Sequence, residues 1–263
     1  MPKTILVIPD CQVKPGVDVS YLTHIGQYIV DKKPDIIVCL GDFWDMPSLS
    51  SYDIGKKSFE GRRYVNDVEV GNNAMHQLLL PLKQAQELAR FQKKKVYQPK
   101  MFFTLGNHEQ RIERAVENDA KLEGIIDYKD LYLKDWEVIP FLKPLIIEDV
   151  VFCHYLTSGV KQLPIASANL LLSKRHQSCV CGHQQGKQIA TAYRADGTEL
   201  TAIIAGSCYT HNEQYMGIQG NNHWRGIIMM YEVENGSFDE SFISLNFLAK
   251  RHDRMVRRQL STS

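Results

Sequence analysis

The sequence predicts an α/β fold. Two observations carry that prediction: an opening strand–helix–strand unit, and a series of apolar strands that each end in polar residues. Residues 3–9 and 35–40 are apolar, β-branched runs of strand length, and residues 21–30 between them place apolar side chains at helical spacing. Such a βαβ unit is expected to hold its two strands parallel and to join them by a right-handed crossover.

The rest of the chain supplies further strands and helices. In the first half we expect a helix over 72–95, kinked at Pro81, a strand over 101–105 and a helix over 111–117. In the second half we expect hairpins over 145–155, 189–205 and 226–247, a strand over 178–181, and a helix over 163–175 that Pro164 begins. The second half is therefore expected to contain less helix than the first.

The domain organisation is expected to be simple. Residues 1–249 are predicted to form one domain, because neither a repeat nor a low-complexity segment divides them. Within it, residues 43–70 are polar, contain basic spots and show no regular period, which favours a lid or insertion. Residues 250–263 form a basic C-terminal tail that is expected to fray.

The composition excludes several classes of protein. The chain has 263 residues, 44% hydrophobic and 23% charged, the profile of a folded globular protein. Its net charge of +1 excludes a strong overall attraction to nucleic acid or to a membrane surface. No apolar run reaches the length of a membrane helix, and the start of the chain lacks the pattern of a secretion signal. The six cysteines include no Cys-x-x-Cys pair, so we expect reduced thiols in a cytoplasmic protein.

Residues of the types that bind metals follow the ends of the predicted strands. They are Asp10, Gln12, Asp42, Asp45, Asn107, His108, His154, His183 and Gln185. In open α/β sheets, ligands bind beyond the carboxyl ends of the strands, so these residues are expected to converge. Carboxylate, amide oxygen and imidazole together suit a divalent ion. Two ions about 3.5–4 Å apart that share one carboxylate would suit phosphoester hydrolysis by a metal-activated water, and Asp42 is the natural bridge.

The order of these motifs resembles the signature of the calcineurin-like metallophosphoesterases. Asp10-x-Gln12, Gly-Asp42-x-x-Asp45, Gly-Asn107-His108-Glu, His154 and Gly-His183-x-Gln185 span about two thirds of the chain. The resemblance implies a four-layer α/β/β/α sandwich, with two mixed sheets flanked by helices around a dinuclear metal site. One ion would take Asp42, Asn107, His154 and His183, and the other would share Asp42 and add Asp10, Gln12 and Gln185. His108 would assist near the phosphate, and Asp45 would orient it.

The sequence departs from the family pattern at two ligands. The family usually has His where Gln12 and Gln185 stand, and both positions fall on the same ion. Because an amide oxygen is a harder ligand than imidazole, we expect Mn²⁺, with Mg²⁺, Zn²⁺, Fe²⁺ or Ni²⁺ as alternatives. An enzyme with one metal and a degenerate binding protein also remain open. The variant resembles phosphoesterases of bacteria and bacteriophages, and a phage-encoded protein would work in the host cytoplasm.

The expected substrate is a phosphoester, with a phosphodiester in DNA, RNA or a nucleotide favoured. Local basic spots support this preference, together with the aromatic side chains of Tyr52, Phe59 and Tyr64, which can stack on bases. A loop rich in glycine and asparagine suggests three further substrate contacts, namely His211, His223 and Arg225. The alternatives are a phosphomonoesterase or protein phosphatase, and a catalytically weak metal-binding scaffold. No membrane partner is expected, and the sequence does not fix the oligomeric state.

Overall fold

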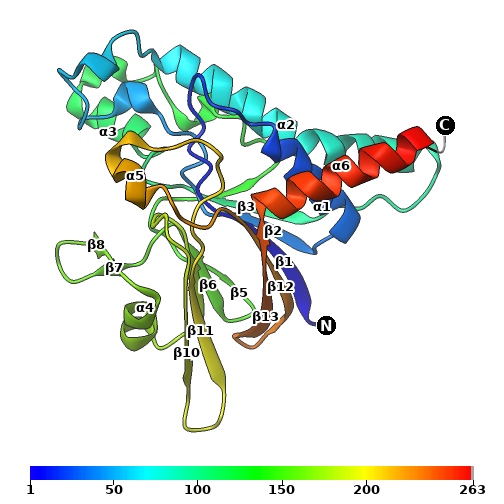
Figure 1. The fold of residues 1–263 in the computed structure, drawn as a ribbon. Coiled ribbons are helices and arrows are strands. Elements are labelled where there is room, and N and C mark those ends of the chain that lie inside the picture. Colours follow the sequence, from blue (N-terminus) through cyan, green and yellow to red (C-terminus); the bar gives the residue numbers. More distant parts are fainter. Residues whose placement is uncertain (262–263) are drawn as a thin grey trace.

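Two mixed β-sheets form the centre of the computed structural model, which describes residues 1–261 and the side chains as far as residue 254. The first sheet has the order β13-β12-β1-β2-β3-β4 and the second has the order β10-β11-β9-β6-β5 (Figure 1). The first sheet comprises β1 (Lys3–Ile8), β2 (Ile36–Cys39), β3 (Lys100–Thr104), β4 (Glu137–Ile139), β12 (Gly226–Glu234) and β13 (Ser237–Ser244). The second comprises β5 (Leu145–Ile147), β6 (Val150–Cys153), β9 (Cys179–Cys181), β10 (Gln188–Tyr193) and β11 (Glu199–Ile204).

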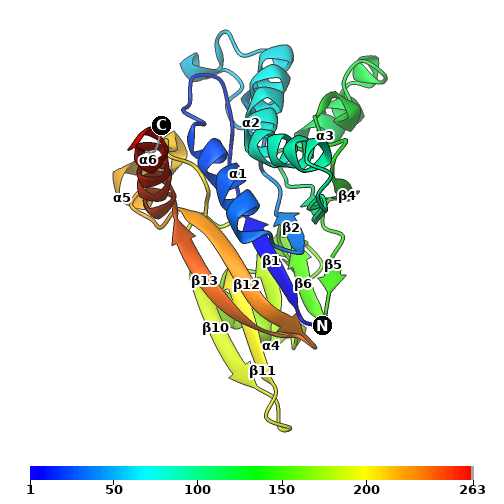
Figure 2. The same ribbon diagram turned by 90° about the vertical axis from the view of Figure 1, so that its right-hand side faces the viewer.

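Helices cover the outer face of each sheet. They are α1 (Tyr21–Lys32), α2 (Tyr64–Phe91) and α6 (Leu245–Ser261) on the side of the first sheet, and the shorter α4 (Ala168–Arg175) on the side of the second (Figures 1 and 2). Two further short helices are α3 (Arg111–Asn118) and α5 (Gly217–Gly220), and there are single turns at η1 (Pro47–Leu49), η2 (Lys57–Phe59), η3 (Ala120–Leu122), η4 (Tyr128–Asp130) and η5 (Gln214–Met216). A small ribbon pairs β7 (Thr157–Ser158) with β8 (Leu163–Pro164). None of the helices described here is both long and apolar enough to cross a bilayer.

Alternating side chains explain the four layers. Along β1, Ile5 and Val7 belong to an apolar cluster that also contains Phe152 and Ile203 of the second sheet, so the two sheets pack face to face. The intervening Leu6 and Ile8 join a second cluster with residues of α1 and α2, because successive side chains of a strand point to opposite faces. A third cluster packs α4 on the second sheet. The expected α/β/β/α sandwich is therefore confirmed.

The parallel core also matches the sequence. Strands β1, β2, β3 and β4 run parallel in sequence order, and β12 and β13 add an antiparallel edge. Figure 2 shows β13, β12, β1 and β2 side by side. The hairpin expected over 145–155 forms as β5 and β6, and its turn has Glu148 and Asp149 in the left-handed region. The parallel order matters for function, because it brings the carboxyl ends of β1, β2 and β3 to one edge.

Three helix boundaries differ from the sequence prediction: the two ends of α2, which ends at Phe91 rather than at 95, and the start of α4. Helix α2 begins at Tyr64 rather than at 72. Its first turns bury Asp67 and Gly71, and because neither residue is apolar, the sequence shows no helical period of apolar residues there. Pro81 lies inside this helix and packs against Gly26 of α1. In the predicted helix over 163–175, only Ala168–Arg175 is helical, and Ser167 caps it by accepting a hydrogen bond from the Leu170 N–H at 3.3 Å.

The C-terminal end of the chain also differs. The last strand ends at Ser244, and residues 250–261 of the expected fraying tail belong to α6. Leu245 and Leu248 are buried in the core, and Arg251 pairs with Asp31 of α1 at 2.9 Å. These contacts hold the first turns of α6 against the core and against α1. Residues 262–263 lie outside the described part of the chain, and the domain limit at 249 stays a prediction.

Candidate metal centre and active-site cleft

The polar strand ends converge at one edge of the two sheets, as the sequence predicts. Asp10 follows β1, Asp42 follows β2, His154 follows β6 and His183 follows β9. The His183 N–H donates to Asp10 Oδ1 at 3.0 Å, and His154 Nε2 lies 3.3 Å from Asp42 Oδ2. Possible ligand atoms of Asp42, His154 and His183 all lie within 4.8 Å of one another. Residues far apart in the sequence therefore form one cluster.

Unusual backbone geometry makes this convergence possible. Asp42 and His183 have φ angles of 48° and 66°, in the left-handed region that non-glycine residues rarely adopt. Gly106 packs directly against the first of them, and a Cβ atom on it would lie 2.1 Å from Asp42 Oδ1. Glycine is thus required where the loop after β3 passes the Asp42 carboxylate.

Glu109 holds the Asp42 loop in place, a role that the sequence analysis did not assign. Its side chain is fully buried and accepts four backbone hydrogen bonds of 2.7–3.0 Å. The donors are the N–H groups of Asp42, Phe43, Trp44 and Gly106. Burial raises the pKa of this carboxyl, as does the neighbouring Asp42, and the backbone donors oppose that rise. The final residue of the Gly-Asn-His-Glu motif is therefore a structural anchor of the site.

The first group of ligands surrounds His154. Its Nδ1–H donates to the carbonyl of Leu40 at 2.7 Å, which leaves Nε2 facing Asp42 and Asn107. Asn107 Oδ1 lies 3.0 Å from that nitrogen. Burial lowers the pKa of His154, but the charge of Asp42 outweighs it and raises the pKa to about 9. Burial and the nearby His154 lower the pKa of His183 to about 4.

The second group of ligands consists of Asp10, Gln12 and Gln185. Gln185 Nε2 donates to Asp10 Oδ2 at 3.2 Å, and Gln12 Nε2 donates to the hydroxyl of Tyr215 at 3.4 Å. With both amide nitrogens engaged, the two Oε1 atoms are buried, and neither has a hydrogen-bond partner among the described residues. A buried acceptor without a partner costs about 1–3 kcal/mol, and a hard cation is the natural partner for an amide oxygen.

These donors fit the dinuclear assignment made from the sequence. Asp42, Asn107, His154 and His183 would offer oxygen and imidazole nitrogen to one ion, and the other would share Asp42 and take oxygen from Asp10, Gln12 and Gln185. The assignment of individual ligands stays a prediction. The two orphaned amide oxygens are the observation that speaks for the second ion, because both lie among its predicted ligands.

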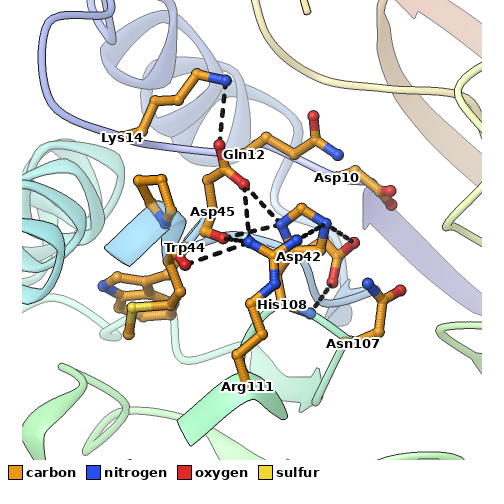
Figure 3. A network of polar contacts seen from close by, with 12 residues as sticks. Asp10, Gln12, Lys14, Asp42, Trp44, Asp45, Asn107, His108 and Arg111 are labelled. Atoms are coloured by element: carbon orange, nitrogen blue, oxygen red, sulfur yellow. Dashed lines mark hydrogen bonds and ion pairs between the residues drawn. The ribbon is translucent and has the colours of Figure 1, made fainter. Parts of the chain in front are cut away.

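His108 and Asp45 lie beside this cluster, as expected for a catalytic pair (Figure 3). His108 Nδ1 lies 2.8 Å from Asp45 Oδ1, and its Nε2 lies 3.6 Å from Asp42 Oδ2. Burial lowers the pKa of His108, but the charge of Asp42, the hydrogen bond to Asp45 and the charge of Asp45 raise it above its ordinary value. Burial alone would raise the pKa of Asp45, but the hydrogen bond from His108 and the nearby cations hold it well below its usual range.

Two cations that sequence reasoning missed contact Asp45. Lys14 Nζ lies 3.1 Å from Asp45 Oδ2, and Arg111 donates to the Asp45 carbonyl at 2.6 Å while its other nitrogen lies 3.2 Å from His108 Nε2 (Figure 3). Arg111 stands two residues after the Gly-Asn-His-Glu motif, at the first position of α3. Its position at the start of that helix, one turn from His108, is the feature of the sequence that could have indicated a role in the site.

The residues expected as substrate contacts fix the loop over 209–222 instead of lining the cleft. Arg225 donates to the carbonyls of Thr210 and Asn221, and His223 lies 2.7 Å from Ser207 Oγ. His211 Nε2 lies 2.7 Å from Glu213 Oε1. Among the described residues, the loop instead presents Asn212–Tyr215 to the cleft. The substrate contacts of His211, His223 and Arg225 stay predictions.

A cleft of 1210 Å³ runs outward from the predicted ligands. The 43–70 segment forms one wall with residues such as Tyr52, Arg62 and Arg63, and the loop over 209–222 contributes to another with Glu213 and Tyr215. Its floor includes Gln12, Asp42, Asn107, His108, Arg111, His183 and Gln185. Five of the seven expected metal ligands thus line a space much larger than a single phosphate group.

Comparison with known proteins agrees with the motifs. The family model described as calcineurin-like phosphoesterase matches residues 3–206, well over half of the chain. The protein is a calcineurin-like phosphoesterase. It is therefore a metal-dependent phosphoester hydrolase of a family that uses a dinuclear metal centre.

Solved structures and curated proteins were compared as well. Yfce, a phosphoesterase from E. coli, is 12% identical, with 92% of this chain and 100% of that chain covered at a TM-score of 0.35. TT1561 of Thermus thermophilus is also 12% identical, with 92% of this chain and 99% of that chain covered at a TM-score of 0.28. No relative was found among the curated proteins. The family assignment rests on the sequence match.

Proposed function

We propose that this phosphoesterase cleaves phosphodiesters in single-stranded nucleic acid or nucleotides. The observation that carries the proposal is the shape of the cleft. At 1210 Å³ it exceeds the range of about 300–1,000 Å³ typical of small-ligand pockets, and its lining includes predicted ligands, the 43–70 segment and the loop over 209–222. A substrate that continues on both sides of the scissile phosphate would fill such a space, whereas a small phosphomonoester would not.

Exposed aromatic side chains stand on both walls. Tyr52 is 78% exposed on the 43–70 segment and Tyr215 is 67% exposed on the loop opposite, and both line the cleft. An exposed aromatic ring offers a stacking surface worth about 1–3 kcal/mol per base. Of the other aromatic residues named from the sequence, Tyr64 donates to Asp130 at 2.8 Å and Phe59 packs under the guanidinium of Arg62. Tyr52 and Tyr215 are therefore our candidates for base stacking.

The basic residues of the 43–70 wall are partly committed to internal contacts. Arg62 and Lys56 both pair with Asp53, at 2.8 and 2.9 Å. Arg63 lines the cleft, and its guanidinium donates to the carbonyl of Arg62. We assign the contact with a flanking phosphate to Arg63, because among the described cations of this wall it is not held by a carboxylate.

In the proposed mechanism the protein orients the phosphate and handles the leaving group. The seven predicted ligands would hold two divalent ions, whose Lewis acidity neutralises the phosphate and activates the attacking water. Asp45 fixes the ring of His108 through Nδ1, so that Nε2 faces the ligand cluster. From there His108 Nε2 is placed to stabilise charge on the phosphate or to give a proton to the leaving oxygen.

One assay tests the reaction class. Hydrolysis of bis-p-nitrophenyl phosphate and of p-nitrophenyl phosphate is compared in Mn²⁺, Mg²⁺, Zn²⁺ and chelator. We expect metal-dependent turnover that favours the diester, abolished in Asp42→Asn and strongly reduced in His108→Ala. Absence of turnover with every metal would refute the enzymatic activity and favour a binding scaffold. A preference for the monoester would refute the proposed phosphodiesterase activity.

A second assay tests the nucleic-acid substrate. With a single-stranded oligonucleotide, Tyr52→Ala and Tyr215→Ala should each raise KM by about fivefold or more, the loss of one stacked base. With methyl p-nitrophenyl phosphate, which has no base, KM should stay at the wild-type value. Equal effects on both substrates would show that the tyrosines support the fold rather than a base. Leu163→Ala, at an exposed residue of β8 outside the cleft, is the control.

We further propose that the physiological metal is Mn²⁺ or a similarly hard ion. The support is that Gln12 and Gln185 present amide oxygens where a zinc site would use imidazole. Isothermal titration should show that the double variant Gln12→His, Gln185→His gains affinity for Zn²⁺ relative to Mn²⁺. An unchanged ratio of the two affinities would show that these side chains do not select the metal.

A further inference from the structure

Lys14 lies between two carboxylates that come from distant parts of the chain. Its Nζ contacts Asp45 Oδ2 at 3.1 Å, and it also contacts both carboxylate oxygens of Glu213, at 2.6 and 2.7 Å. The side chains of Lys14, Asp45 and Glu213 are 22%, 12% and 6% exposed, so all three are largely withdrawn from solvent. Ion pairs in such a setting are screened less than pairs on the surface.

The position of Lys14 follows from the pairing of two loops. The segment after β1 runs beside the segment after β2, with Val13 and Trp44 in a parallel bridge. The Asp45 N–H donates to the carbonyl of Val13 at 2.9 Å, which places Lys14 next to Asp45. The same pairing holds the Gly-Asp42-x-x-Asp45 motif against the Asp10-x-Gln12 motif. Lys14 is therefore fixed by the backbone of the active site itself.

Glu213 is fixed by the loop over 209–222. The Asn221 side chain accepts from the Glu213 N–H and donates to the Glu213 carbonyl, both at 2.8 Å, and His211 lies 2.7 Å from its carboxylate. The carboxylate is thus held toward Lys14 from its own side. Two residues on, Tyr215 of the same loop contacts Gln12. The loop therefore meets the active site at two adjacent points.

We propose that Lys14 is a positioning residue, which joins the loop over 209–222 to the Asp45–His108 pair and so sets the orientation of His108. This inference rests on the role of His108 given above. Lys14 engages Asp45 Oδ2, while Asp45 Oδ1 receives His108 Nδ1 at 2.8 Å (Figure 3). One oxygen of the carboxylate is anchored so that the other can orient the imidazole. Without the ammonium group, Asp45 and Glu213 would face each other as like charges, and the loop would move away.

The experiment compares Lys14→Met, Lys14→Arg, Glu213→Gln and the double variant Lys14→Met, Glu213→Gln on bis-p-nitrophenyl phosphate. Lys14→Met should lower kcat by about 10- to 100-fold through misplacement of His108. KM should stay at the wild-type value, and Lys14→Arg should restore most of the loss. Glu213→Gln should cost less, and that cost should vanish when Lys14 is already Met. Lys83→Met is the control, because Lys83 pairs with Asp135 at 2.8 Å outside the cleft.

Two kinetic results would overturn the inference. One is wild-type kcat in Lys14→Met. The other is an undiminished effect of Glu213→Gln in the Lys14→Met background. Hydrogen exchange gives a readout that needs no turnover: amides of 209–222 should exchange faster in Lys14→Met and not in Lys83→Met. An unchanged loop would also overturn the inference, whereas an inactive wild type would count against the proposed function alone.

Discussion

Replacement of Glu109 by glutamine gives the sharpest test of how this site is held together. The change keeps the size of the side chain and removes one acceptor oxygen. In the native site Oε1 accepts from the N–H groups of Phe43 and Trp44, and Oε2 accepts from those of Asp42 and Gly106. Whichever oxygen becomes the amide NH₂, two buried backbone donors lose their acceptor and face a third donor.

The expected cost follows from that count. Each buried donor left without a partner costs about 1–3 kcal/mol, so Glu109→Gln should lower the free energy of unfolding by about 2–6 kcal/mol. The total free energy of unfolding of a typical domain is only about 5–15 kcal/mol. Because one of the four donors is the N–H of Asp42, the affinity for divalent metal should fall as well. The native contacts of Asp42 with His108 and His154 depend on the same loop.

Denaturant unfolding followed by circular dichroism measures the stability, and isothermal titration with Mn²⁺ measures the metal affinity. Glu117→Gln is the matched control, because Glu117 is an exposed glutamate of α3, and its change should shift neither quantity. If Glu109→Gln unfolded at the same denaturant concentration as the control, the Glu109 carboxylate would not be carrying four backbone hydrogen bonds. Lost metal affinity without lost stability would contradict the reasoning equally, since both effects are derived from one loop.

Two further outcomes test the surroundings of the site. Gly71→Ala places a methyl group 1.8 Å from the Trp44 ring and should lower the free energy of unfolding by about 1–3 kcal/mol, although alanine is the better helix former. Thermal unfolding would check this against Gly186→Ala, which enters open space and should be neutral. Hydrogen bonds, led by that from Lys56, lower the pKa of Asp53 from 3.8 to about 2, so its contribution to stability is present above 3.8 and is lost as the pH falls toward 2. An NMR titration should place the midpoint near 2 and show a rise in Lys56→Met; an unshifted midpoint in that variant would contradict the assignment.

The sequence was sufficient for the sheets and for the place of the site. Each metal-ligand motif is short and directly follows an apolar strand, so local pattern and the rule for parallel sheets together predict convergence. Helix α2 shows where that approach fails. Its first turns bury Asp67 and Gly71, a carboxylate that accepts from the Ser48 N–H at 2.8 Å and a glycine that makes room for Trp44. Neither residue gives an apolar period, because tertiary contacts rather than hydrophobicity draw them inside.

The basic C-terminal segment, which the structure places in α6 as far as Ser261, shows a related limit. Its composition indicated a solvated tail, because basic residues dominate it and the apolar residues that anchor it come just before it. Leu245 and Leu248 lie in the core, and Arg251 pairs with Asp31 across 220 positions of sequence. Pairings over such separations depend on how helices pack, and no local pattern reports them.

The loop over 209–222 shows most clearly what a sequence can and cannot give. Its glycine and asparagine content indicated a functional loop near the site, and the structure places it there. The residues that reach the cleft include Glu213 and Tyr215, while Arg225 holds the loop from behind. Glu213 meets Lys14 and Tyr215 meets Gln12. Through these two separate contacts the loop can act on the pair that orients His108 and on one of the two unusual metal ligands, a coupling that the spacing of the motifs alone does not contain.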